Sequence, residues 1–311
     1  MTDLRDERGQ VMVLTALFMV VMVAMTAFVV DVGSWFRAQR ATQSTVDAAA
    51  LAGAQALPAD PAAASSLAIS YGDKNGGGVA GANITFDSKY APNDTIRITT
   101  KKDAPGFFSS VFGLGSVSVG AHASAVSGVP TSAEYVAPVV VNIKHPDLSG
   151  PGCSAGCFGP AHTTTLPLGK TGEPGAFDLL NLNQNQTTGT VGASTLADWI
   201  QNGYSKYLPL GGYFSDPGAK FNGNPLQGAL DARVGTDLLF PVYDTLVAQG
   251  SNASYHVIAW VGFHLLPGSS ISGNTGTLVG YFTKVIWQGI LPASGPDNVP
   301  DLGAHSVALV D

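Results

Sequence analysis

Two cysteines and two histidines near the middle of the chain are the residues whose types could do the most chemistry. Cys153 and Cys157 are the only cysteines, and with His145 and His162 they fall within eighteen residues. Thiolate and imidazole groups are ligands that Zn²⁺ prefers, but this spacing matches no established zinc pattern. In an exported domain the two cysteines would form a disulfide that closes a small loop, which is the interpretation we favour. A pair of free thiols is the remaining alternative.

A serine between these cysteines matches a second chemical pattern. Residues Gly152–Gly156, with Ser154 at the centre, have the G-x-S-x-G spacing of the nucleophile elbow in acyl hydrolases. The elbow requires a strand directly before the serine and a helix directly after it. Pro151 and Pro160 stand in these flanks, so neither element is predicted. We therefore expect no catalytic residue, and no pattern in the chain indicates a cofactor, a metal site or a small-molecule substrate.

The composition excludes nucleic acid as an expected partner. The net charge is −7 and only 12% of the residues are charged, so no basic stripe is available to neutralise phosphates. Hydrophobic residues make up 45%, and there are 38 glycines and 19 prolines. This low charge and high turn content are typical of an exported, β-rich domain rather than of a cytosolic enzyme.

The elements that must position these residues begin with a membrane anchor. Val11–Val30 contains no charged residue, and only Thr15 and Thr26 have polar side chains. A helix of that length covers about 30 Å, the thickness of the hydrocarbon core of a bilayer. Because a core helix is normally apolar on one face only, this segment predicts a membrane-spanning helix. No proline occurs between Gln10 and Leu57, so we expect the helix to continue beyond the membrane as an exposed rod.

The residues around and after this span form a distinctive pattern: a charge-flanked apolar helix, then D-x-G, two arginines and an alanine-rich DAAALAGA segment. The residues that carry the pattern are Arg8, Gly9, Gln10, Asp31, Gly33, Arg37 and residues 47–54. The pattern resembles the N-terminal signature of TadG-like proteins, the minor pilin-like membrane proteins of the TadE/TadG family in the bacterial Flp/Tad pilus machinery. The resemblance is specific over this segment and weaker over residues 95–126.

The resemblance implies a non-enzymatic, membrane-anchored component of Flp/Tad pilus assembly. Its implied partners are the membrane, other pilin-like subunits and the Tad inner-membrane platform. It also implies a single-pass protein of the cell membrane with its N-terminus in the cytoplasm and its C-terminal domain outside. Relatives that a leader peptidase cuts carry Glu five residues after the cleaved Gly. Here Leu14 stands at that distance from Gly9, so we expect the anchor to be retained.

Five residues of this segment are candidates for helix packing and assembly: Asp31, Gly33, Arg37, Asp47 and Gly53. Asp31 ends the apolar run, where an ionisable group needs lipid headgroups or a partner. It either caps the span at the interface or pairs with a basic group on a neighbouring pilin-like helix and fixes its register. The small residues around Gly53 allow another backbone to approach closely.

The whole chain predicts an α+β fold with three domains. Residues 1–57 form the anchor and long helix, 58–129 a small α/β layer packed on that helix, and 130–311 a mainly antiparallel β domain. Asp60 has the position of an N-cap for a helix over Pro61–Lys74. Alternating patterns predict strands at 95–100, 116–126, 135–143, 238–246, 255–266 and 277–287, the last three as an antiparallel meander.

Two other function classes remain as alternatives. One is a membrane-tethered envelope enzyme whose site lies in the loops over residues 149–174 or in the C-terminal sheet. The other is an adhesin or carbohydrate-binding surface protein, which would expose Trp260, Trp287 and Tyr281 together on one face. If these aromatic side chains are buried, they belong to the core instead.

Overall fold

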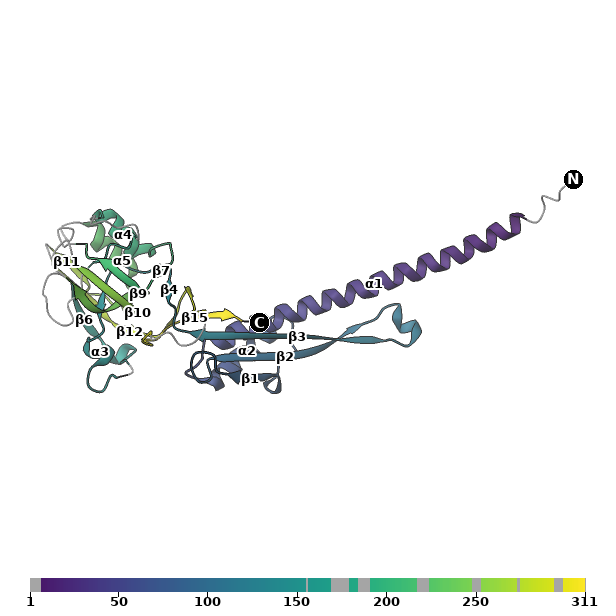
Figure 1. The fold of residues 1–311 in the computed structure, drawn as a ribbon, viewed down its shortest axis with the longest axis horizontal. Helices are drawn as coiled ribbons and strands as arrows, with labels where there is room; N and C mark the ends of the chain where they lie inside the picture. The colour runs from purple at the N-terminus through teal and green to yellow at the C-terminus, as the bar shows by residue number, and fades with distance from the viewer. Residues whose placement is uncertain are drawn as a thin grey trace. The chain divides into compact units, whose positions relative to one another are not determined.

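The computed structural model describes residues 7–154, 156–168, 179–183, 191–216, 224–247, 253–272, 275–293 and 299–310. The fold is α+β, with a long N-terminal helix, a mixed α/β region and antiparallel-rich sheets (Figure 1). The chain divides into two compact units, the first formed by Met1–Val126 with Leu309–Asp311 and the second by Ser127–Ala308.

The first unit is built on one unbroken helix, α1 (Glu7–Ala54), of 48 residues. Its apolar first half makes it long and apolar enough to cross a membrane once, and none of the most apolar window is buried. The helix ends three residues before the predicted Leu57. Pro58 gives the reason, because a proline disfavours helical backbone in the residue before it. Gln55, Ala56 and Leu57 form tighter turns, each N–H donating to the carbonyl three residues earlier.

Helix α2 (Pro61–Lys74) begins as the sequence predicts, with the Asp60 side chain accepting the Ala63 N–H at 2.9 Å. The short 3-10 turn η1 (Gly81–Asn83) leads into strand β1 (Ile84–Asp87). Strands β2 (Thr95–Pro105) and β3 (Ser116–Gly128) form a long hairpin, joined by a second 3-10 turn, η2 (Ser109–Phe112). All neighbouring pairs in the order β1-β2-β3 are antiparallel.

The outer half of α1 packs against α2 and β2, and Figure 1 shows the hairpin running beside it. The core between them consists mostly of small residues on the helices and larger ones on the strand. Its fully buried members include Val46, Ala49, Ala50, Ala64, Ala68, Ile96 and Ile98. Small side chains let the two helix backbones approach closely, as the alanine-rich segment predicts.

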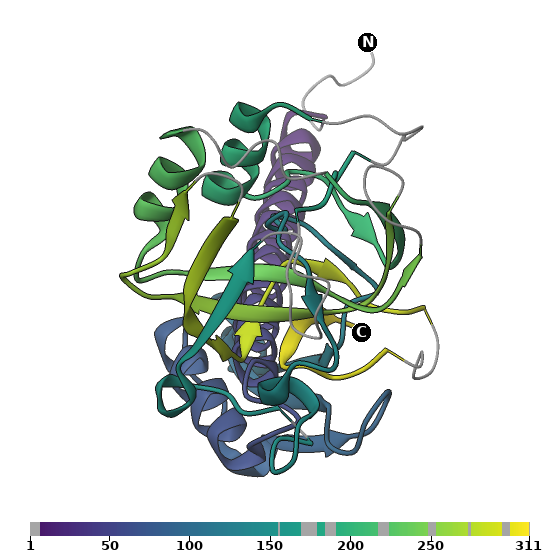
Figure 2. The same cartoon turned by 90° about the vertical axis from the view of Figure 1, so that its left-hand side faces the viewer.

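The described part of the second unit consists of short helices and strands around the sheet that contains β9, β10 and β12. Before the sheet's long strands come β4 (Ser132–Ala133), β5 (Val141–Asn142), α3 (Pro146–Ser149), η3 (Pro160–His162), β6 (Thr164–Leu168), α4 (Ala193–Asn202), β7 (Leu208–Pro209), β8 (Gly211–Phe214) and α5 (Asn224–Arg233). The remaining strands are β9 (Asp237–Val247), β10 (Ser254–Leu265), β11 (Ser270–Ser272), β12 (Thr275–Thr283), β13 (Val285–Ile286), β14 (Gly289–Ile290) and β15 (Ala304–Leu309). Helices α4 and α5 lie side by side (Figure 2).

The predicted meander is confirmed for β9, β10 and β12, but its third strand ends at Thr283, and Val285–Ile286 form β13, which pairs parallel with β15 in another sheet. Strand β10 pairs antiparallel with β9 along most of its length and with β12 at its C-terminal end. Strand β8 pairs with the N-terminal end of β10, and β6 pairs with β12. The aromatic side chains of Phe240, Phe263 and Phe282 pack together in the core of this sheet.

The predicted continuous strand over residues 135–143 is wrong. Only β5 forms a ladder there, pairing parallel with β9, while Val136 and Val139 make isolated bridges. Tyr135 has a φ of 56°, outside the extended region, and Pro138 has no N–H to donate to a ladder. The hydrophobic alternation over this segment therefore reflects burial without regular strand pairing.

Candidate functional site: the outer half of the long helix

The five candidate assembly residues of α1 differ in whether the first unit covers them. Asp31, Asp47 and Gly53 face elements of the first unit, whereas Gly33 and Arg37 are exposed. The segment therefore has positions that the first unit covers and positions that it leaves open.

Asp31 is covered by the loop between β2 and β3, although it directly follows the apolar run. Its side chain is almost completely buried, at 2% exposed. Oδ1 accepts the backbone N–H of Phe107 at 2.9 Å, both oxygens accept that of Phe108 at 3.1 and 3.0 Å, and Oδ2 accepts that of Ser109. These donors begin the turn η2, where backbone N–H groups have no partner within the turn. The sequence carries no signal that joins Asp31 to a loop so far along the chain.

Asp47 orients a second contact between the helix and the hairpin. Its Oδ1 accepts Nε2 of Gln43 at 2.7 Å, and the same Nε2 donates to the carbonyl of His122 in β3 at 2.8 Å. Gln43 lies twelve residues beyond Asp31 on the helix, and His122 lies well back along β3 from the hairpin loop. The hairpin is therefore tied to α1 at two levels.

Gly53 is a close-approach position. A Cβ built there would lie 2.6 Å from Cδ1 of Ile96, 3.0 Å from the carbonyl oxygen of Ala64 and 3.2 Å from Cβ of Ala68. Only glycine leaves room for α2 and β2 at this distance. The small residues around Gly53 therefore allow close packing of α2 and β2 of the same chain, rather than of a second subunit.

Gly33 has the opposite environment. A Cβ built there would meet no atom within 4 Å, and Arg37 beside it is exposed. Phe36, a large apolar side chain on this part of the helix, is 60% exposed. A glycine, an aromatic ring and an arginine thus form an open strip on the outer half of α1, which we name the outer strip.

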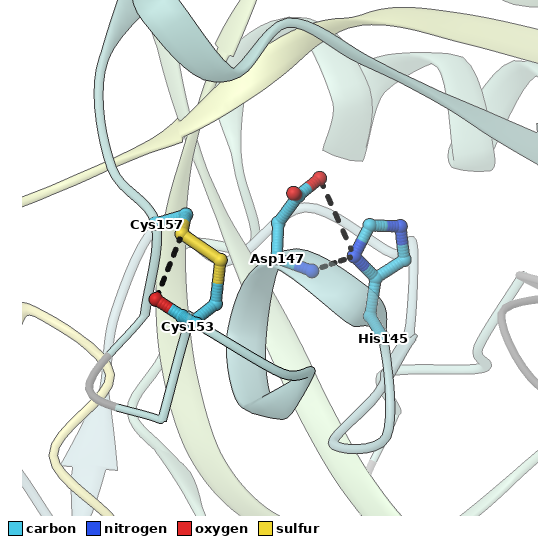
Figure 3. Close-up of a disulfide and its surroundings, with 5 residues drawn as sticks. His145, Asp147, Cys153 and Cys157 are labelled. Atoms are coloured by element: carbon cyan, nitrogen blue, oxygen red, sulfur yellow. Dashed lines mark hydrogen bonds and ion pairs between the residues drawn. A yellow bond between two sulfur atoms is a disulfide. The ribbon is translucent and has the colours of Figure 1, made fainter.

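The predicted disulfide is confirmed, and Cys153 and Cys157 are joined with their Cα atoms 5.1 Å apart (Figure 3). The carbonyl of Asp147 accepts the Cys157 N–H at 2.7 Å, which ties the disulfide loop to α3. Both sulfurs are bonded to each other, so neither is a thiolate that could bind zinc in this structure. Among the residues that the structure describes, no cluster of three or more potential metal ligands occurs.

His145 caps α3 beside this loop. Its Nδ1 accepts the Asp147 N–H at 3.2 Å (Figure 3). Its ring packs edge-on against Phe282, with the ring centroids 5.1 Å apart. Burial lowers the pKa of His145, and the nearby carboxylate of Asp147 only partly opposes that shift. The imidazole is therefore a neutral structural cap rather than a charged group.

The structural context of a nucleophile elbow is missing around Ser154. The serine is exposed in the disulfide loop, which follows the one-turn helix α3 rather than a strand. In the described part of the chain, Ser154 makes no hydrogen bond to a histidine. The sequence predicts neither a strand before Ser154 nor a helix after it, and the structure agrees with that prediction.

The aromatic residues of the carbohydrate-binding alternative do not form one exposed face. Trp260 is buried and its Nε1 donates to the carbonyl of Pro130 at 3.1 Å. Trp287 is half-buried against the core, with its Nε1 donating to the carbonyl of Glu134 at 2.7 Å. The ring of Tyr281 stacks on His264. Trp260 is therefore a core side chain, and Trp287 packs against the core with part of its surface exposed.

Comparison with known proteins identifies the N-terminal segment. Residues 9–56 match the model of the Flp pilus-assembly TadE/G-like family, named Tad. The match covers nearly the whole of α1 and includes Asp31, Gly33, Arg37, Asp47 and Gly53. Searches among curated proteins and among solved structures found no match to the chain.

Proposed function

We propose, from the premise that residues 9–56 form a Tad-family segment, that this protein is a non-catalytic, minor pilin-like component of Flp/Tad pilus assembly. The single observation that carries the proposal is the coincidence of that segment with one continuous, largely exposed helix. The Tad family is generally structural, and a long apolar N-terminal helix is of the kind that anchors a protein by a single pass.

The outer strip is the part of the helix that we assign to lateral association. A Cβ at Gly33 would meet no atom within 4 Å, Phe36 is 60% exposed, and the exposed Arg37 can donate hydrogen bonds to an acidic or carbonyl group of a neighbour. Glycine at a helix surface allows a second helix backbone to approach closely. The expected neighbours are other pilin-like subunits and the Tad inner-membrane platform. Gly53 supports this role indirectly, because it lets the α/β layer pack on the opposite side of the helix, and Asp47 does so by orienting Gln43 toward β3.

The proposed orientation has the N-terminus in the cytoplasm, with the α/β layer and the β-rich domain of residues 130–311 outside. The disulfide supports it, because such bonds persist in oxidising compartments. Carbonate extraction of membranes should leave the full-length protein in the pellet, and protease added to spheroplasts should digest the C-terminal domain. A thiol reagent should label Cys153 and Cys157 only after reduction.

Photo-crosslinking tests the assembly role directly. We would place a photoreactive phenylalanine analogue at Phe36 in cells that assemble the pilus, and at Tyr71 on α2 as a control. Both residues are exposed aromatics of the same unit, so the two variants differ in position rather than in chemistry. Crosslinks to small pilin-like or platform membrane proteins are expected at Phe36 and not at Tyr71.

Two results would contradict the proposal. One is a Phe36 variant that is present in the membrane at normal level and gives no protein adduct. The other is a strain that lacks the protein and still assembles a normal number of pili. A Gly33→Leu variant should weaken the Phe36 crosslinks, whereas Gly33→Ala should largely preserve them, because only the longer side chain keeps a neighbouring backbone away.

A further inference from the structure

The loop at the end of the β2–β3 hairpin exposes a group of large apolar side chains. We name residues 107–114 the hairpin tip. Its exposed apolar residues are Phe107, Phe108, Val111, Phe112 and Leu114. Val111 is 80% and Phe112 is 83% exposed, which are high values for apolar side chains of this size. A contiguous apolar group on a surface marks a site that something else covers.

The hairpin tip lies beside the end of the apolar run on α1. At one level Gln43 contacts His122 of β3, and at the other Asp31 contacts the backbone of the tip. The hairpin therefore extends along α1 toward the N-terminus of that helix, as Figure 1 shows. Asp31 directly follows Val30, the last residue of the uncharged segment. Lipid that covers the apolar run would thus border the tip.

The sequence of the hairpin is suited to that environment. Residues 104–121 contain no charged side chain, so none has to be removed from water when the tip contacts lipid. Phenylalanine and small polar residues such as Ser110 are compatible with the headgroup region of a bilayer. By contrast, the neighbouring positions Lys101 and Lys102 are charged and exposed.

Asp31 removes the main obstacle to this placement. Backbone N–H groups without a partner are costly where water is scarce. The three N–H groups at the start of η2 all donate to the Asp31 carboxylate, which is itself expensive to hold at the end of a membrane span without partners. Each group therefore satisfies the other, and the loop is fixed to the helix at the depth where the span ends.

We propose that the hairpin tip is a second membrane-contact element. It inserts its apolar side chains into the lipid interface next to the transmembrane helix, and Asp31 holds it there as a positioning residue. The occupant of the apolar surface is lipid, because this surface continues that of the membrane anchor. The protein would then have two points of contact with the membrane, which would restrict tilting of the α/β layer relative to the bilayer.

Spin labelling of the full-length protein in vesicles of phosphatidylethanolamine and phosphatidylglycerol tests this proposal. Single cysteines are introduced as Val111→Cys at the tip, Val20→Cys within the span and Thr85→Cys on the exposed face of β1. The native cysteines are paired and do not react with the label. Collision with oxygen reports lipid, and collision with a water-soluble nickel complex reports water. The Val111→Cys label should shift from the water-like ratio of Thr85→Cys toward the lipid-like ratio of Val20→Cys.

Two outcomes would overturn the proposal. A Val111→Cys label that matches Thr85→Cys places the tip in water. A label that is protected from both reagents, increasingly so at higher protein density, shows that a second copy covers the tip instead of lipid. In the Asp31→Asn background the label should gain mobility and nickel access, and unchanged spectra would remove Asp31 from the proposal. These vesicles contain no other pilus protein, so a negative spin-labelling result does not contradict the proposed assembly role. A negative crosslinking result at Phe36 likewise does not contradict lipid contact by the hairpin tip.

Discussion

Replacing Gly53 by valine tests the close packing of α1 on its own α/β layer. The Cβ would already lie 2.6 Å from Cδ1 of Ile96 and 3.0 Å from the carbonyl oxygen of Ala64. Atoms in ordinary contact lie about 3.5–4.0 Å apart, so the helix and the layer must separate. Such overpacking costs about 1–3 kcal/mol, and the better helix propensity of valine over glycine returns only a few tenths. We expect a net loss of about 2 kcal/mol in the local free energy of opening.

Hydrogen exchange of the α2 amides in the full-length protein measures this loss. Since every 1.4 kcal/mol corresponds to about a factor of ten, exchange from locally opened states should become about 30-fold faster in Gly53→Val. Gly33→Val is the matched control, because a Cβ at Gly33 meets no atom within 4 Å. It should leave α2 exchange unchanged, and β10 of the second unit should be unaffected in both variants. Equal α2 exchange in the two variants would refute the packing argument.

Three further predictions concern single contacts. Asp60→Ala should destabilise the first turn of α2 by about 1 kcal/mol, seen as faster local exchange, whereas Asp60→Asn should not, because it keeps the N-cap acceptor. The lowered pKa of His145 means that the unfolded state takes up the proton first, so this residue's contribution to stability is present above its usual pKa and is lost as the pH falls below it. Melting curves across that range should therefore show a weaker acid dependence for His145→Asn, and an identical dependence would contradict the burial argument. Replacing Cys153 and Cys157 by serine should cost about 2 kcal/mol in chemical denaturation, because a loop with a sequence separation of 4 restricts little chain entropy; a far larger loss would indicate that the disulfide holds more than its own loop.

Local patterns were sufficient for the elements whose interactions lie within a few residues. The uncharged run over residues 11–30 predicts the long helix, and the Asp60 cap predicts the start of α2. Alternation predicts β9, β10 and β12 and the order in which they pair. The prediction over residues 135–143 failed because alternation reports burial, whereas strand pairing also needs extended backbone and free N–H groups, which Tyr135 and Pro138 do not provide.

The candidate site was only partly predictable for a different reason. The Tad-like pattern identifies Asp31, Gly33 and Gly53 as residues of one helix segment, but it does not show which of them the chain itself covers. Gly33 and Gly53 are twenty residues apart, which at about 3.6 residues per turn puts them on nearly opposite sides of the helix. The structure covers Gly53 with α2 and β2 and leaves Gly33 open.

The sequence by itself determined that the uncharged segment Val11–Val30 is helical, that it has the length of a membrane span and that it lies within a Tad-like segment. These features depend only on residue types and helical rise. Only the tertiary structure decided that the Asp31 carboxylate binds the backbone of Phe107, Phe108 and Ser109 and that the hairpin tip lies beside the end of the span. Such a contact joins residues 76 or more positions apart, and it forms because buried charges and unpaired N–H groups must find partners wherever the folded chain brings them together.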